Sequence, residues 1–239
     1  MMKNLVRLTH FEVFLLTAVF IFVLFGLYFS HTNREFFEMV YTLEDGLVEW
    51  ITVGLLGFGA CFSWWRAMVL RTLRPRLFIL CAIGLGFVFL FGLGEEISWG
   101  QRIFGWKSPE FFYLYNSQGE TNLHNLVFGD FKVNKTIFGL FLGIFVALYV
   151  AILPFLYRGS SKARKLVNRL ALPLPRLIHL FFYLLLFAIV SQMPSGKKGE
   201  ILEFGGCALF LLIVLNPVNQ HVFDKNDRFD PDKFDPARF

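Results

Sequence analysis

The sequence predicts an all-α polytopic membrane protein with six transmembrane helices. Three observations lead to this prediction: 56% of the 239 residues are hydrophobic, only 17% are charged, and the hydrophobic residues gather into long uninterrupted blocks. Soluble proteins carry about 25% charged residues, so this composition excludes a soluble nucleic-acid module. The sequence has three cysteines, and all of them lie inside the hydrophobic blocks. Because their number is odd and they are embedded in these blocks, a disulfide scaffold is also excluded.

Each block is long enough to cross a hydrocarbon core about 30 Å thick as a helix that rises about 1.5 Å per residue. The predicted spans cover residues 11–29, 47–65, 77–94, 136–157, 177–193 and 201–218. Open strands are excluded because lipid offers no partner for an unpaired backbone group. We therefore assign residues 1–218 to one transmembrane domain, with a loop over 95–135, and residues 219–239 to a polar cytoplasmic tail.

The distribution of Lys and Arg predicts that both termini are cytoplasmic. With that orientation two basic residues precede the first span, four lie in the loop 66–76, six in the loop 158–176 and four in the tail, together 16 of the 23. Basic residues are retained on the cytoplasmic side of a membrane. We expect the protein to reside in the plasma or inner membrane.

The acidic residues show the opposite distribution, because 12 of the 18 fall at the outer face or at outer span ends. Acidic residues contribute little to orientation, so insertion does not explain this bias. Glu49 and Glu203 lie about one turn inside their spans, where an ionised side chain costs energy. Glu95 and Glu96 stand at the C-terminal end of the third span, where the helix dipole disfavours anions. We therefore expect a functional site at the outer face.

The loop that follows the third span contains signals for two short interfacial helices. Residues 108–110 (Ser-Pro-Glu) predict the start of the first, and residues 117–120 (Ser-x-x-Glu) predict a capping box for a second that ends near residue 129. On this second helix Glu120 and His124 would share a face. A carboxylate at that spacing can orient an imidazole as a general base, or both groups can bind one metal ion.

One hypothesis is a membrane enzyme, a hydrolase or transferase that acts on a lipid or lipid-linked substrate. Its catalytic residues would be Glu96, His124 and Glu120. A divalent ion (Zn²⁺, Mg²⁺, Mn²⁺ or Fe²⁺) would polarise the substrate and activate water. The metal ligands would be Glu49, Glu95, Glu96, His124 and Glu203. Substrate would be bound by Gln101, Asn122 and Asn125, which can donate to an oxyanion, and by Arg102, which can pair with a phosphate.

The alternative is a non-enzymatic membrane protein, with a structural or assembly role, whose Glu, Arg and His side chains form an ion-pair network. In the simplest form of this alternative the third helix continues, and Glu95 pairs with Arg102 on one face. A proton- or cation-coupled transporter is less well supported, because the span centres are apolar and no internal repeat is seen. Convergence of the acids around Arg102 would favour a network or an anion site, and convergence without it would favour a metal.

Overall fold

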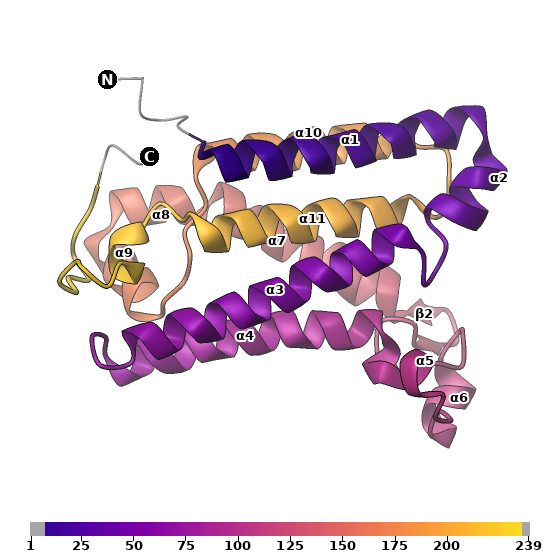
Figure 1. Ribbon diagram of the computed structural model, residues 1–239, viewed down its shortest axis with the longest axis horizontal. Helices are drawn as coiled ribbons and strands as arrows, with labels where there is room; N and C mark the ends of the chain where they lie inside the picture. Colours follow the sequence, from indigo (N-terminus) through magenta and orange to yellow (C-terminus); the bar gives the residue numbers. More distant parts are fainter. Residues whose placement is uncertain (1–7, 236–239) are drawn as a thin grey trace.

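The computed structural model describes residues 8–235, which fold almost entirely as helices that run back and forth along one axis (Figure 1). The bundle is built from α1 (His10–Thr32), α3 (Leu47–Leu70), α4 (Arg76–Glu96), α7 (Leu142–Ala151), α10 (Leu177–Ser191) and α11 (Lys198–Leu215). The π-helix η4 (Asn134–Phe141) leads into α7, and α8 (Leu153–Gly159) continues it.

The two ends of the bundle differ. The loop end carries α2 (Arg34–Phe36), the π-helix η2 (Phe37–Tyr41) and the segment between α4 and η4. The tail end carries α9 (Ser161–Arg169), the short helix η5 (Gln220–Phe223) and the start of α1.

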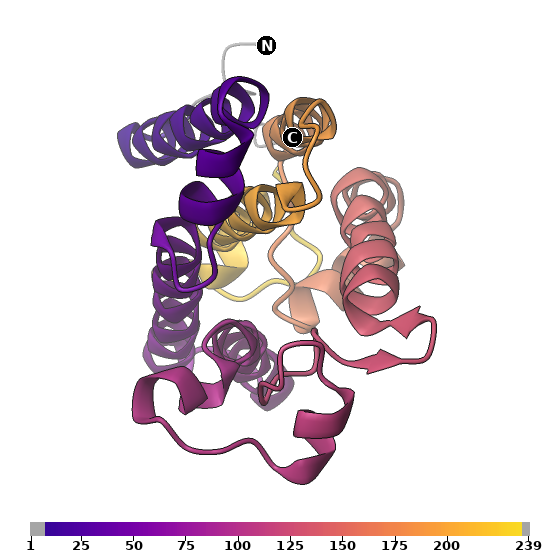
Figure 2. The same cartoon turned by 90° about the vertical axis from the view of Figure 1, so that its right-hand side faces the viewer.

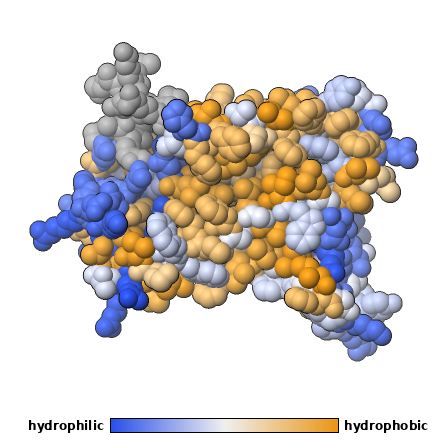
Figure 3. All heavy atoms as spheres, in the orientation of Figure 1, coloured by the Kyte–Doolittle hydropathy of each residue, from blue (hydrophilic) through white to orange (hydrophobic). Residues whose placement is uncertain are grey.

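Helices form at all six expected positions, and four segments are long and apolar enough to cross a membrane: α1, α3, α4 and the continuous segment Asn134–Gly159. Helix α10 is shorter, at 15 residues, and α11 carries charged residues in its first two turns. An apolar band crosses the middle of the molecule, with hydrophilic residues at both ends (Figure 3). The chain is therefore an all-α membrane protein.

Helix α11 lies at the centre of the bundle, between two groups of helices. Phe204 and Ala208 pack with α1 and α10, whereas Leu211 and Val214 pack with α3 and with Phe89 of α4. Because lipid tails are as apolar as these side chains, close packing drives the association of helices within a bilayer.

Two glycines allow α3 and α4 to approach closely. A Cβ added to Gly59 would lie 2.5 Å from the ring of Phe89, and one added to Gly86 would overlap the indole of Trp64. The aromatic rings thus occupy the space that a side chain would fill, and Trp64 Nε1 also donates to the carbonyl of Ile83 in α4 at 3.2 Å.

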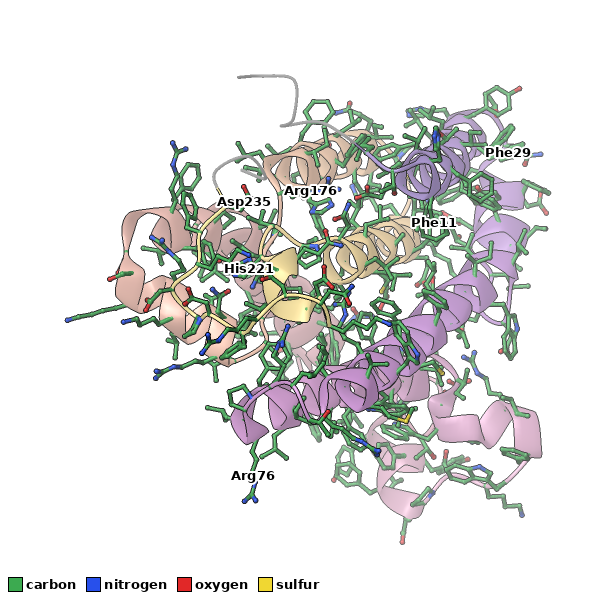
Figure 4. All side chains as sticks on the ribbon, turned by 60° about the vertical axis from the view of Figure 1, so that its left-hand side comes forward. Phe11, Phe29, Arg76, Arg176, His221 and Asp235 are labelled. Carbon is green, nitrogen blue, oxygen red and sulfur yellow. The ribbon has the colours of Figure 1, made fainter. Side chains whose placement is uncertain are left out.

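Buried charges join the helices at the tail end. Glu12 forms an ion pair with Arg176 and accepts from Asn216 Nδ2 at 2.9 Å, which ties the starts of α1 and α10 to the end of α11. Arg66 of α3 donates to the carbonyl of Val214 at 2.8 Å and so satisfies the C-terminal end of α11. Arg176 lies beside the central helix in Figure 4.

The polar tail, up to residue 235, is docked against the tail end. Arg74 donates to the carbonyls of Val222 and Asp224 at 2.7 and 2.6 Å, and Asn168 of α9 donates to that of Pro231 at 2.9 Å. His221 and Asp235 lie within this segment in Figure 4. The tail therefore bridges the α3–α4 turn and α9.

Candidate functional site

Helix α4 ends in a left-handed turn rather than continuing. Ser98, Trp99 and Gly100 have φ of 48°, 53° and 86°, and a non-glycine residue in this region costs about 1–3 kcal/mol. The expectation that one helix face carries Glu95 and Arg102 is therefore wrong, because the left-handed turn reverses the chain between them. Backbone strain of this kind is retained mainly at functional sites.

Glu95 is a buried carboxylate that holds the loop against α4. It is 3% exposed, and its Oε1 accepts from Trp99 Nε1 at 2.9 Å. Its Oε2 accepts from the backbone amides of Leu123 and His124 at 2.7 and 2.9 Å, and His124 Nδ1 lies 3.5 Å from the same oxygen. Glu95 thus fixes both the backbone and the ring of His124.

The second interfacial helix, expected over residues 117–129, does not form. Asn116 Oδ1 accepts from the amide of Glu120 at 3.2 Å, and Asn116 Nδ2 donates to Asn122 Oδ1 at 2.8 Å. Side chains that hydrogen-bond nearby backbone in this way compete with helix formation. The chain then enters a hairpin of β1 (Val127–Phe128) and β2 (Phe131–Lys132).

The first interfacial helix is present as α6 (Glu110–Tyr115), but without the expected serine cap. Ser108 instead donates to the carbonyl of Gly119 at 2.6 Å and lies 3.0 Å from Gln101 Oε1. Gln101 Oε1 also accepts from the amide of Thr121 at 2.7 Å. Gln101 therefore holds the loop together, and its predicted role in binding substrate has no support from these contacts.

Glu120 faces away from His124, so the expected pair of these residues is not formed. Its Oε2 accepts from Ser98 Oγ at 2.5 Å and from Asn122 Nδ2 at 3.2 Å, and its Oε1 lies 3.9 Å from Arg102 Nε. Ser98, which is fully buried, was not anticipated from the sequence. The left-handed turn is what aims its hydroxyl at the loop.

Arg102, in the short helix α5 (Gln101–Phe104), is surrounded by acidic groups. It pairs with Glu49, lies 3.3 Å from Asp45 Oδ1 and donates to the backbone carbonyl of Glu96. Burial alone would lower the pKa of its guanidinium, but Glu49, Glu120 and Asp45 raise it above the usual value. The charge of Arg102 is therefore matched by carboxylates of the same chain.

In the described part of the chain, the side chains of Glu96, Glu200 and Glu203 form no ion pair, and one ring nitrogen of His124 is left over. Within residues 8–235 His124 Nε2 makes no hydrogen bond. Burial would lower the pKa of the imidazole, but the hydrogen bond to Glu95 and the charges of Glu203, Glu95 and Glu200 outweigh it and raise this pKa above its ordinary value.

Carboxyl groups from two helices lie in the same region. Glu96 at the end of α4 is close enough to Glu203 of α11, and to Glu49 and Glu200, for their charges to act on it. The charge of Glu203 also acts on the imidazole of His124.

The structure separates the predicted metal ligands into two groups. Glu49 and Glu95 are used by Arg102 and by the loop backbone, whereas Glu96, His124 and Glu203 keep free atoms. Among residues 8–235, no three His, Cys, Asp or Glu side chains are arranged to hold a metal ion. Asn125, predicted to bind substrate, donates to Gln118 Oε1 at 2.7 Å on the exposed side of the loop.

Comparison of the chain with protein-family models, with curated proteins and with solved structures gave no match.

Proposed function

We propose that this chain is an integral membrane enzyme, a hydrolase or transferase, with an acid–base site that acts on a lipid or lipid-linked substrate. The proposal rests on the different contacts that the two ring nitrogens of His124 make at the loop end. The ring of His124 is held through Nδ1 by buried Glu95, its Nε2 makes no hydrogen bond to any described residue, and Glu203 is close enough for its charge to act on the imidazole.

This arrangement supplies the general base and the general acid that a hydrolysis needs. Nε2 of His124 takes a proton from water, and the resulting hydroxide attacks the ester or phosphoryl centre. The leaving oxygen takes a proton from the carboxyl group of Glu96, which acts as the general acid. In a transfer reaction an acceptor hydroxyl replaces the water. Glu95 holds the imidazole in one orientation, as carboxylates do in other His-based sites.

We further propose six spans with both termini in the cytoplasm of a cell bounded by a plasma or inner membrane. The basic connections 66–76 and 158–176 and the tail lie together at the tail end, which supports this orientation. The acid–base site then faces the outer leaflet, where α6 presents aromatic side chains suited to the interface.

A metal-dependent form of the enzyme would use Glu96, Glu203 and His124 as ligands for Zn²⁺, Mg²⁺, Mn²⁺ or Fe²⁺. These side chains would have to draw together first, given their present arrangement. Three protein ligands with an open position would let the ion polarise the substrate. The proton-transfer form needs no such movement, and we therefore prefer it.

The test compares membrane-lipid composition in cells that express the wild-type chain, His124→Ala, Glu96→Gln or, as a control, Glu110→Gln. Glu110 is exposed in the same loop. We expect a lipid species that changes with the wild type and the control but not with the two site variants. Metal content of the purified proteins, measured in parallel, separates the two forms of the enzyme. Identical lipid profiles for all four chains would refute the enzymatic proposal.

The network around Arg102 favours a second candidate, a structural or assembly role. Its side chain joins α3, the end of α4 and the loop. Under this candidate Arg102→Met disrupts the loop and loses a partner subunit in co-purification, while His124→Ala changes neither lipids nor partners.

A further inference from the structure

A cavity of about 310 Å³ lies at the tail end, where the polar tail meets the start of α4. Three segments line it: Pro75 and Leu77 at the start of α4, Arg169 at the end of α9, and Phe229 and Pro231 of the tail. Its volume is at the lower end of the range of small-molecule sites, about 300–1,000 Å³. The cavity is therefore large enough for part of a lipid molecule, and four of its five lining residues are apolar.

The wall that the tail contributes is held by contacts with two helices. The ring of Phe229 lies 5.8 Å from that of Phe78 in α4, and the guanidinium of Arg74 lies 5.6 Å from the centre of the Phe229 ring. The carbonyl of Pro231 accepts from Asn168 Nδ2 of α9 at 2.9 Å. The first of the two Phe-Asp-Pro triplets in the tail therefore forms a fixed wall of the cavity.

Arg169 brings an unmatched positive charge to this cavity. It is exposed, and within residues 8–235 its guanidinium forms no hydrogen bond or ion pair. The same holds, over the same residues, for Arg76, which stands between the two lining residues at the start of α4 and extends away from the ribbon in Figure 4. Asp230 of the tail wall accepts from the amide of Asp232 at 2.9 Å instead. An anion at the cavity would therefore meet two available cations, and a guanidinium is suited to phosphate.

The cavity lies at the end of a face of α4 that the other helices leave uncovered. Leu77, Leu80 and Phe87 follow one another on this face by the helical period, and they are 52%, 65% and 57% exposed. The view along the bundle in Figure 2 shows α4 at the periphery of the bundle helices. Because α4 is long and apolar enough to cross a membrane, this face contacts hydrocarbon and the cavity lies near the level of the headgroups.

We propose that this cavity binds an anionic phospholipid. The phosphate lies against Arg169, with Arg76 nearby, the glycerol ester region fills the apolar cavity, and one acyl chain follows Leu77 and Leu80 along α4. A zwitterionic phospholipid offers the same phosphate but adds an ammonium group that both arginines repel. The cavity lies at the opposite end of the bundle from the acid–base site, so this inference does not depend on the proposed function.

The test measures binding of the first lipid to the purified full chain in detergent micelles by native mass spectrometry. Dioctanoyl phosphatidylglycerol is expected to bind about tenfold more tightly than dioctanoyl phosphatidylcholine, because basic residues at a membrane surface favour anionic lipid. Glycerol phosphate, which has the charge but no acyl chain, should not displace the phosphatidylglycerol.

Two matched arginine variants separate this site from general attraction to a basic surface. Arg169→Gln should weaken binding of phosphatidylglycerol about tenfold, because it removes a charged hydrogen-bond donor. Arg158→Gln removes the same charge from an exposed position in α8 at the same end of the bundle, outside the cavity, and should leave binding unchanged. Equal losses in the two variants would show diffuse surface attraction and would overturn the inference.

Leu77→Trp tests the cavity itself without a change of charge. An indole at this position occupies the apolar space, so phosphatidylglycerol should bind about tenfold more weakly than to wild type. Unchanged binding in this variant, equal affinity for the two lipids, or displacement by glycerol phosphate would each overturn the assignment of the cavity to an anionic phospholipid.

Discussion

Glu95→Gln is the substitution that best tests how the loop is held. The carboxylate accepts three hydrogen bonds, two from the amides of Leu123 and His124 and one from Trp99 Nε1. Glutamine has nearly the same shape but only one acceptor oxygen. If this oxygen keeps the two backbone bonds, its NH₂ group must face the Trp99 N–H.

The cost follows from these contacts. Leaving the buried donor of Trp99 unsatisfied costs about 1–3 kcal/mol. The two backbone bonds lose their charge assistance, which roughly halves their strength and removes about 1 kcal/mol each. The neutral amide is easier to bury than the carboxylate, which offsets part of this loss. We expect the loop to be destabilised by about 2–3 kcal/mol relative to wild type.

Hydrogen exchange of the amides of Leu123 and His124, measured in detergent micelles, reports this change directly. A loss of about 2–3 kcal/mol corresponds to exchange about 30- to 150-fold faster. Glu110→Gln, in the same loop, is the control and should leave exchange at both amides unchanged. Protection equal to wild type in Glu95→Gln would show that Glu95 does not anchor the loop.

Three further predictions concern pH, the tail and helix packing. Glu95 raises the pKa of His124. The His124–Glu95 contact therefore stabilises the loop at low pH, and this contribution is lost as the pH rises through the raised pKa. Glu95→Gln should lower the pKa of His124, which an NMR titration of the imidazole would measure. Arg74→Ala removes charged hydrogen bonds to the tail, each worth about 1.5–3 kcal/mol, so proteinase K should cleave the tail at least about tenfold faster; an unchanged rate would contradict the docked tail. Gly86→Val should lower the midpoint of thermal unfolding, at a cost of about 1–3 kcal/mol from overpacking, whereas Gly84→Val, with no atom within 4 Å of its Cβ position, should not; equal midpoints would exclude the close α3–α4 contact.

The bundle was predictable from the sequence because a membrane span is a local feature. An apolar block of about 20 residues specifies its own helix, and α1, α4 and α11 begin or end within three residues of the expected spans. The same logic placed the acidic residues at one end of the bundle.

The connections at the loop end were not predictable, because they depend on contacts between distant residues. Arg102 meets Glu49, 53 positions away, instead of Glu95, and Glu95 meets His124, 29 positions away. The spacing of Glu120 and His124 suggested a helix, but the asparagine at position 116 competes for the backbone. Gly100 alone hinted at the left-handed turn that makes this arrangement possible.

The central place of α11 has a consequence for biogenesis. This helix follows α1, α3, α4 and α7 in the chain, yet it supplies the surface on which α1, α10 and α3 pack. Until it is inserted, Arg66 of α3 has no helix end to donate to, and its guanidinium must reach the headgroup region instead. Helices α3 and α4 can pair as soon as both are inserted, because their contacts do not involve α11. Helix α1 lacks its main packing surface until α11 arrives, so the complete bundle forms only after α11 is in place.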